Sequence, residues 1–188
     1  MIKDIFILIE NHIWNLRCRY NYWMHGAYGL TRTIEKMPFR FVVKYFRKYG
    51  ATVGENVIID SGFKIHRPSS GLPLKNLVIG DSVYIGHRVL FDLTEKITFE
   101  NNTAMGADCQ IWTHVGNYKE NLRDKNDYKE KIAPVILRSG VVVYSCSVLN
   151  PGTDIGEKSR IFGLSMVGGA IPGSEVWGGI PAKYIKSI

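Results

Sequence analysis

Residues 137–167 read LRSGVVVYSCSVLNPGTDIGEKSRIFGLSMV and carry an aliphatic residue at every sixth position. The heads of these six-residue units are Leu137, Val143, Leu149, Ile155, Ile161 and Val167. An α-helix requires apolar residues about every 3.6 positions and a half-buried strand about every 2, so this period indicates one short strand and one tight turn per unit. We expect three units to close one triangular coil, and each aliphatic head to point inward and stack on the head eighteen residues away.

The same period begins earlier in the chain and is interrupted twice. Two excursions, at about residues 66–76 and 116–134, leave the repeat, and the second is rich in charge with no apolar period. Glycine follows several heads, and we expect it to supply positive φ at the corners. The earlier heads are Val53, Ile59, Ile65, Ile79, Ile85, Phe91 and, after a slip of two residues, Phe99, Met105 and Ile111. The period predicts a coil over residues 51–176 with a tail over 177–188.

Residues 1–50 form a different kind of sequence. Apolar residues at three- and four-residue spacings predict two amphipathic helices, broken near residues 26–29. The first apolar run is too short to span a bilayer, is interrupted by charges and lacks the cleavage site of a signal peptide. We therefore expect an N-terminal helical cap on the coil.

Most of the net charge of +7 belongs to this segment, which holds nine basic and three acidic residues. Its basic face either meets water or lies on anionic phospholipid. No nucleic-acid-binding motif accompanies the charge, so we expect no nucleic-acid partner. The basic residues of this face are Arg17, Arg19, Arg32, Lys36, Arg40, Arg47 and Lys48.

Cysteine usage indicates a reducing compartment. Cys18, Cys109 and Cys146 are odd in number and lack metal-ligand spacing. We expect reduced thiols in a cytoplasmic protein, peripheral at the inner face of the membrane if the basic helices bind lipid.

Three stretches resemble the hexapeptide-repeat acyltransferases. They are Ile79-Gly-Asp-Ser-Val-Tyr-Ile-Gly86, Leu149-Asn-Pro-Gly-Thr-Asp-Ile-Gly156 and Gly178-Gly-Ile-Pro-Ala-Lys183. The sequence is most similar to the maltose and galactoside O-acetyltransferases and to the O-acetyltransferases of capsule and exopolysaccharide synthesis. The resemblance covers roughly residues 50–188 and implies a left-handed parallel β-helix, a homotrimer with active sites between neighbouring coils, and acetyl-CoA as acyl donor with no metal.

Acyl transfer to a sugar hydroxyl requires a base, because almost none of the hydroxyl is ionised near neutral pH. Histidine suits this role, since its ordinary pKa of about 6.5 leaves it mostly neutral at pH 7. His114 comes three residues after the inward Ile111 and directly before the charged excursion. The resemblance identifies it as the catalytic base, and implies that Asp92, about one coil upstream, orients it.

The other four histidines fall into two groups according to their position in the chain. His12 and His25 belong to the helical segment, whereas His66 and His87 could line a cleft. The family's oxyanion-binding asparagine has no counterpart in Ile85-Gly-His-Arg88, which leaves His87 or a backbone N–H for that task. Trp112 offers a flat apolar wall for a sugar ring.

The resemblance also implies part of a coenzyme A wall. The pantetheine arm is expected to pass Ser145 and Gly163, and the phosphates to meet Lys183 and Lys186. Trp177 either stacks on the adenine or packs across the trimer. Gly168-Gly169 and Val142 depart from the usual Thr-Lys pair and tryptophan of the family.

Two other function classes remain open. A non-catalytic scaffold is compatible with the same coil, because fold does not determine function. A zinc carbonic anhydrase of this fold is disfavoured, since that family pairs histidines five residues apart and Lys119 stands five residues after His114. The leading hypothesis is an acetyl-CoA-dependent O-acetyltransferase in polysaccharide assembly.

Overall fold

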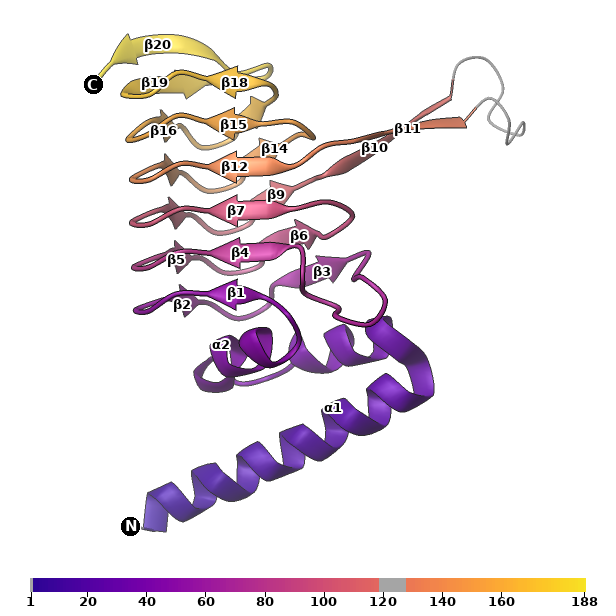
Figure 1. The fold of residues 1–188 in the computed structure, drawn as a ribbon. Helices are drawn as coiled ribbons and strands as arrows, with labels where there is room; N and C mark the ends of the chain where they lie inside the picture. The colour runs from indigo at the N-terminus through magenta and orange to yellow at the C-terminus, as the bar shows by residue number, and fades with distance from the viewer. Residues whose placement is uncertain (1, 119–127) are drawn as a thin grey trace.

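The computed structural model describes residues 2–118 and 128–188 and shows a parallel β-helix stacked on an N-terminal helical layer (Figure 1). The chain enters the coil at the helical end, and its C-terminus lies at the opposite end.

Three sheets form the sides of the triangular coil, and successive coils pair in parallel. Sheet A contains β1 (Thr52–Val53), β4 (Leu77–Ile79), β7 (Ile97–Phe99), β12 (Val135–Leu137), β15 (Asp154–Ile155) and β18 (Ala170–Ile171). Sheet B contains β2 (Ile58–Ile59), β5 (Tyr84–Ile85), β8 (Ala104–Met105), β13 (Val142–Val143), β16 (Arg160–Ile161), β19 (Glu175–Gly178) and the antiparallel β20 (Lys183–Ser187). Sheet C contains β3 (Lys64–His66), β6 (Leu90–Asp92), β9 (Gln110–Ile111), β14 (Val148–Leu149) and β17 (Met166–Val167).

The six-residue heads form the core, as the period predicts. Leu137 pairs with Ile155, Val143 with Ile161, and Leu149 with Val167, so each head stacks on the one eighteen residues away. All of these side chains are buried. Burial of a fully enclosed aliphatic side chain contributes about 1.5–3 kcal/mol, so the column is a main source of stability.

Glycine after a head has a different cause from the predicted one. Gly86 has no positive φ; a Cβ at this position would lie 2.8 Å from the backbone nitrogen of Ala107 in the next coil. At Gly156, the corresponding distance to the nitrogen of Gly173 is 2.4 Å. The expectation of positive φ at these glycines is wrong, because close approach of successive coils excludes the side chain. Positive φ falls two residues later, on the non-glycine residues Asn56, Ser82, Arg88, Asp108 and Lys158.

The N-terminal segment is helical and breaks near residues 26–29, as the apolar spacing predicts, but it also has a second break that was not expected. Helix α1 (Ile2–Ile34) is kinked at Gly26, where φ is 62° and ψ is −154°. It then continues, and α2 (Phe39–Lys48) starts after Pro38. The second helix therefore begins later than the apolar spacing indicated, because proline disfavours helical geometry in the residue before it.

The end of α1 and all of α2 pack against the first coil. The rings of Phe46 and Phe63 meet edge to face with centroids 5.3 Å apart. Oε1 of the buried Glu35 accepts a 2.9 Å hydrogen bond from the backbone nitrogen of Ile65. Among the described residues, no helix is both long enough and apolar enough to cross a membrane.

Both excursions leave the coil at the edge between sheets C and A. The first separates β3 from β4, and the second separates β9 from β12. The second contains an antiparallel arm, β10 (His114–Tyr118) with β11 (Tyr128–Ile132), which extends away from the coil (Figure 1). The sequence showed no apolar period here, because both faces of the arm lie outside the core. The charged residues Lys119, Glu120, Arg123, Asp124, Lys125 and Asp127 lie outside the described part of the chain.

Candidate active site

The predicted catalytic pair lies at the edge between sheets C and A, which we call the C–A edge. Asp92 ends β6, and His114 begins β10 after a short turn that follows β9. Because β6 and β9 are neighbours in sheet C, these two side chains leave the coil at adjacent levels of one edge. The coil thus brings together residues that are 22 positions apart in sequence.

His114 and Asp92 are in direct contact. Nδ1 of His114 lies 2.6 Å from Oδ2 of Asp92, and the carboxylate is fully buried while the imidazole is nearly so. Since an ionised carboxylate can only accept hydrogen bonds, we assign the proton to Nδ1. This leaves the Nε2 lone pair of a neutral His114 free to accept a proton.

Asp92 is held as a carboxylate by several donors. Its Oδ2 also accepts hydrogen bonds from the backbone nitrogens of Thr113 (2.8 Å) and His114 (2.9 Å) and from the Thr113 hydroxyl (3.0 Å). Its Oδ1 accepts one from the Thr94 hydroxyl (2.8 Å). Burial alone would raise the pKa of Asp92, but the hydrogen bonds from His114, Thr94 and Thr113 outweigh it and hold this pKa below its usual value.

Two further rings enclose His114. His66 stacks on it with centroids 5.4 Å apart and planes 18° from parallel, and Trp112 meets it edge to face at 6.0 Å. Burial lowers the pKa of His66, and the neighbouring His114 and arginines lower it further despite the opposing charge of Asp92. Protonation of His66 is therefore disfavoured beside His114.

Strand β11 brings a carboxylate close to the free side of the base. Oε1 of Glu130 lies 3.9 Å from Nε2 of His114, beyond hydrogen-bonding distance, and also contacts Arg67. The base therefore has an acidic neighbour from the arm, and Arg67 of the first excursion pairs with that carboxylate.

A groove of about 470 Å³ opens beside His114. Trp112 lines it together with Asn150 and Met166 from later coils. Nε1 of Trp112 donates a 3.0 Å hydrogen bond to Oε1 of Gln110, which fixes the ring plane. The groove offers an apolar wall and an amide close to the base, a combination suited to a polar ligand with an apolar face.

His66, Asp92 and His114 have potential metal-ligand atoms within 4.8 Å of one another. The contacts of this cluster favour hydrogen bonding instead, because Oδ2 of Asp92 is already occupied by donors, Nδ1–H of His114 among them. A catalytic zinc site of the three-histidine type would need another histidine than the two in this cluster.

The edge between sheets B and C, which we call the B–C edge, holds a second group of predicted residues. Gly163 lies directly over Ser145: a Cβ on Gly163 would be 3.0 Å from the Ser145 carbonyl oxygen. Gly106 lies below Ser145, with only 2.6 Å available between its added Cβ and the Ser145 nitrogen. Successive coils therefore pack closely at these two glycines, and the Ser145 side chain is exposed at this edge.

His87 lies at the same B–C edge and has no contact with His114. Its Nδ1 is 3.4 Å from the Ser61 hydroxyl, and its Nε2 is 3.5 Å from Oδ2 of Asp60. Within one chain the structure therefore does not bring His87 and His114 together.

The remaining predicted residues lie on the last strands. Trp177 is in β19, where its Nε1 donates to Glu175 (2.7 Å) and its ring meets Tyr184 edge to face at 6.4 Å. Lys183 and Lys186 are exposed on β20, which pairs with β19. These basic side chains are accessible to an anionic ligand at the C-terminal end of the coil.

Sequence reasoning did not assign Thr94, Thr113 and Glu130 to the site, and it named His66 only as a histidine that could line a cleft. A signal for His66 was present, because Ile65, Phe91 and Ile111 are heads of one column and the next residues are His66, Asp92 and Trp112. Thr94 and Thr113 form their hydrogen bonds to Asp92 from irregular turns, and Glu130 belongs to the antiparallel arm. None of the three occupies a fixed position in the six-residue repeat, so the repeat could not indicate them.

The fold is that of solved hexapeptide-repeat acetyltransferases. A galactoside acetyltransferase in complex with coenzyme A has a TM-score of 0.75 at 21% identity, covering 90% of this chain and 82% of that chain. A hexapeptide-repeat acetyltransferase from Vibrio cholerae O1 biovar eltor, complexed with acetyl coenzyme A, has a TM-score of 0.72 at 21% identity, covering 86% and 84%. A maltose O-acetyltransferase from Clostridium difficile 630 has a TM-score of 0.68 at 20% identity, covering 94% and 88%. No protein-family model matches the sequence, and comparison with curated proteins found no match.

Proposed function

We propose that this chain is an acetyl-CoA-dependent O-acetyltransferase that acts on a hydroxyl of a sugar or polysaccharide precursor. The 2.6 Å contact between Nδ1 of His114 and Asp92 carries the proposal, because it prepares the opposite nitrogen as a general base. Support for the reaction class comes from the solved acetyltransferases that share this fold.

The proposed reaction uses one histidine for both proton transfers. Nε2 of His114 takes the proton of the acceptor hydroxyl as its oxygen attacks the thioester carbonyl of acetyl-CoA. The tetrahedral intermediate then collapses, the carbon–sulfur bond breaks, and His114 returns the proton to the departing thiolate. The products are the acetyl ester and free coenzyme A.

Asp92 acts on the base and does not touch the substrate. Its buried carboxylate fixes the imidazole orientation and stabilises the imidazolium that forms during attack. Thr113 and Thr94 hold the carboxylate in turn. Trp112 and Asn150 line the groove in which the acceptor would lie.

The acyl donor is proposed to use the B–C edge. The pantetheine arm would pass Ser145 and Gly163, and Lys183 and Lys186 would meet the phosphates as mobile point charges. Trp177 adds an aromatic surface for the adenine. His87, at the same edge, is the proposed donor to the oxyanion.

These two groups stand at opposite edges of sheet C, so one chain does not complete the site. We propose a homotrimer in which the B–C edge of one copy faces the C–A edge of the next. Such a head-to-tail contact buries different surfaces on each partner and closes into a ring with three-fold rotation. Each trimer then holds three equivalent sites.

Acetyl-CoA turnover over a panel of acceptors tests the proposal. Thiol release would be measured with free sugars, sugar nucleotides and lipid-linked sugars, and acetyl-CoA binding by calorimetry. The expected result is thiol release that depends on a hydroxyl acceptor. Failure to bind acetyl-CoA would instead favour a non-catalytic scaffold.

A further inference from the structure

The first arm of α1, residues 2–25, has two opposite apolar faces. Its inner face packs on α2: Cys18 is fully buried, the Tyr45 hydroxyl donates to the Asn11 carbonyl (2.9 Å), and Lys48 donates to Asn15 (2.6 Å). The opposite face therefore points away from both α2 and the coil, as the position of α1 in Figure 1 also shows. We call its exposed large side chains the outer stripe: Ile5, Phe6, Ile9, Ile13, Leu16, Tyr20, Trp23 and Met24.

The outer stripe is unusually apolar for a surface exposed to water. Trp23 is 80% exposed and Phe6 66% exposed, and the members recur at three- and four-residue spacings. Contiguous apolar surface of this kind marks a site of interaction. The same helix does not qualify as a membrane span, so an apolar partner would have to meet it from the side.

Cations flank the outer stripe. Arg17 lies one turn from Ile13 and Tyr20 on one flank, and Arg19 follows on the other side of Leu16. Among the described residues, no carboxylate forms an ion pair with either guanidinium. The basic residues of α2, by contrast, have partners within the chain: Arg40 pairs with Glu10, and Arg47 donates to the Val53 carbonyl.

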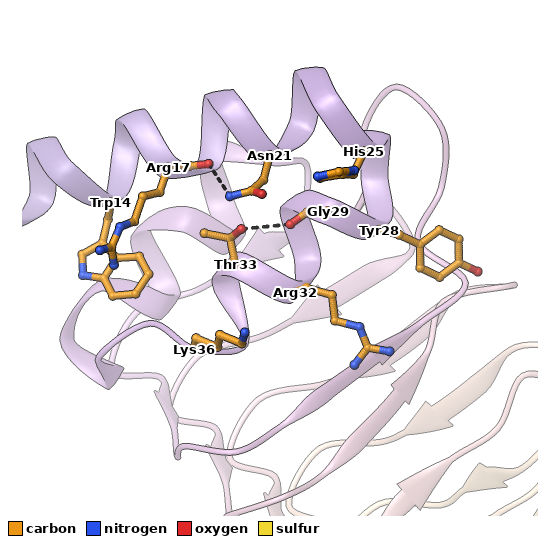
Figure 2. A pocket seen from close by; sticks show the side chains of 9 residues that line it. All are labelled: Trp14, Arg17, Asn21, His25, Tyr28, Gly29, Arg32, Thr33 and Lys36. Carbon is orange, nitrogen blue, oxygen red and sulfur yellow. Dashed lines mark hydrogen bonds between the residues drawn. The ribbon is translucent and has the colours of Figure 1, made fainter.

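A basic hollow lies beside the stripe, inside the kink of α1 (Figure 2). Arg17 and Lys36 line it together with Arg32, and the lining contains no carboxylate. Arg32 forms an ion pair with Glu35, with 3.2 Å between nitrogen and oxygen. The guanidinium of Arg17 instead lies over the Trp14 ring, 5.2 Å from its centroid. Arg17 therefore stands between an apolar surface and a positively charged concavity.

We propose that the outer stripe of α1 docks on an anionic phospholipid surface, lying in the plane of the membrane interface. The apolar side chains would enter the boundary between headgroups and acyl chains, and the flanking cations would contact anionic headgroups. Trp23 and Tyr20 suit this boundary because their rings combine an apolar body with a polar atom. Charge complementarity favours this occupant over a second copy of the chain, since the cations that flank two facing stripes would repel each other. The inference is independent of the acetyltransferase reaction.

Vesicle flotation of the full chain tests the docking surface. Binding is expected with vesicles of phosphatidylglycerol and phosphatidylcholine, weaker binding with phosphatidylcholine alone, and a decrease with added salt. Leu16→Asp is expected to lower partitioning about tenfold or more, and Arg17→Gln about fivefold. Ile188→Asp is the matched control, since Ile188 is 61% exposed at the far end of the coil and should leave partitioning unchanged.

Brominated phosphatidylglycerol vesicles give a second measurement that does not depend on protein stability. They should quench the fluorescence of the wild type, and Trp23→Phe should lose most of this quenching. Absence of quenching in the wild type would overturn the proposal. So would unchanged vesicle binding in Leu16→Asp accompanied by a smaller oligomer in sedimentation, because that result would assign the outer stripe to contact between copies of this chain.

Discussion

Oδ2 of Asp92 accepts hydrogen bonds from Nδ1 of His114 and from the backbone nitrogen of the same residue, at 2.6 and 2.9 Å. One carboxylate oxygen therefore fixes both the main chain and the ring of the proposed base. A residue held both at its main chain and at its ring loses little freedom when substrate binds, which favours catalysis by orientation.

Asp92→Asn tests the electrostatic part of this arrangement. The amide oxygen can still accept from the Thr113 and His114 nitrogens, but the charge that stabilises an imidazolium is lost. We expect kcat to fall about 10²-fold or more with little change in the KM for acetyl-CoA. Steady-state kinetics with the thermal unfolding midpoint as a control would show this. An equal loss of kcat and of folded protein would make Asp92 a structural residue only.

Substitutions of Trp112 and Trp177 should distinguish the acceptor site from the acetyl-CoA site. Trp112→Ala removes the apolar wall beside the base and is expected to raise the KM for the acceptor about tenfold, leaving the KM for acetyl-CoA unchanged. Trp177→Ala should have the reverse pattern, since Trp177 lies with the basic residues of β20. The two KM values of each variant, measured on the best acceptor of the panel, decide the assignment, and matching effects would contradict it.

Subunit mixing tests whether the site is shared. His114→Ala disables the C–A edge, and Ser145→Trp blocks the B–C edge, so each pure variant should be inactive. After mixed refolding at equal amounts, random trimers should recover about a quarter of wild-type activity, because that fraction of interfaces joins two intact edges. No recovery despite mixed trimers, checked by native mass spectrometry, would place the whole site within one chain.

His66 should make the protein less stable as pH falls below neutrality. Its folded pKa is below the unfolded value of about 6.5, so the unfolded state binds more protons between the two values. The free energy of unfolding should therefore fall as pH is lowered through that window. His66→Phe keeps a stacking ring without titration, and its urea-unfolding curves between pH 7 and 5 should show a smaller loss. Equal losses of stability in both proteins would show that His66 does not contribute to the pH dependence of folding.

The fold was predictable because its strongest signal repeats. Each head, from Val53 to Val167, is buried for the same reason, so single deviations do not hide the period. The start of α2 was missed because Met37 and Phe41 continue the apolar spacing across Pro38, although Pro38 breaks the helix. The glycine corners were misinterpreted because close approach between coils is a tertiary effect that a single unit does not reveal.

The site was predictable only in part. A family resemblance pointed to His114 and Asp92, and the structure places them in contact. Thr113 and Thr94 could not be predicted, because their role depends on turn geometry that forms around the buried carboxylate. The surface proposed to dock on lipid also differs from the one that the sequence indicated. The sequence indicated the basic face of residues 1–50, whereas several of its members, such as Arg47, form hydrogen bonds within the chain.

The most direct test of the account is the turnover of His114→Ala with acetyl-CoA and the best acceptor. His114 lies at the edge of the coil and is not part of the aliphatic core, so its removal should preserve folding, the oligomeric state and acetyl-CoA binding. We predict that acetyl transfer falls at least about 10²-fold while the Kd for acetyl-CoA changes little, because only proton transfer is lost. Normal turnover by this variant would contradict the assignment of His114 as the general base.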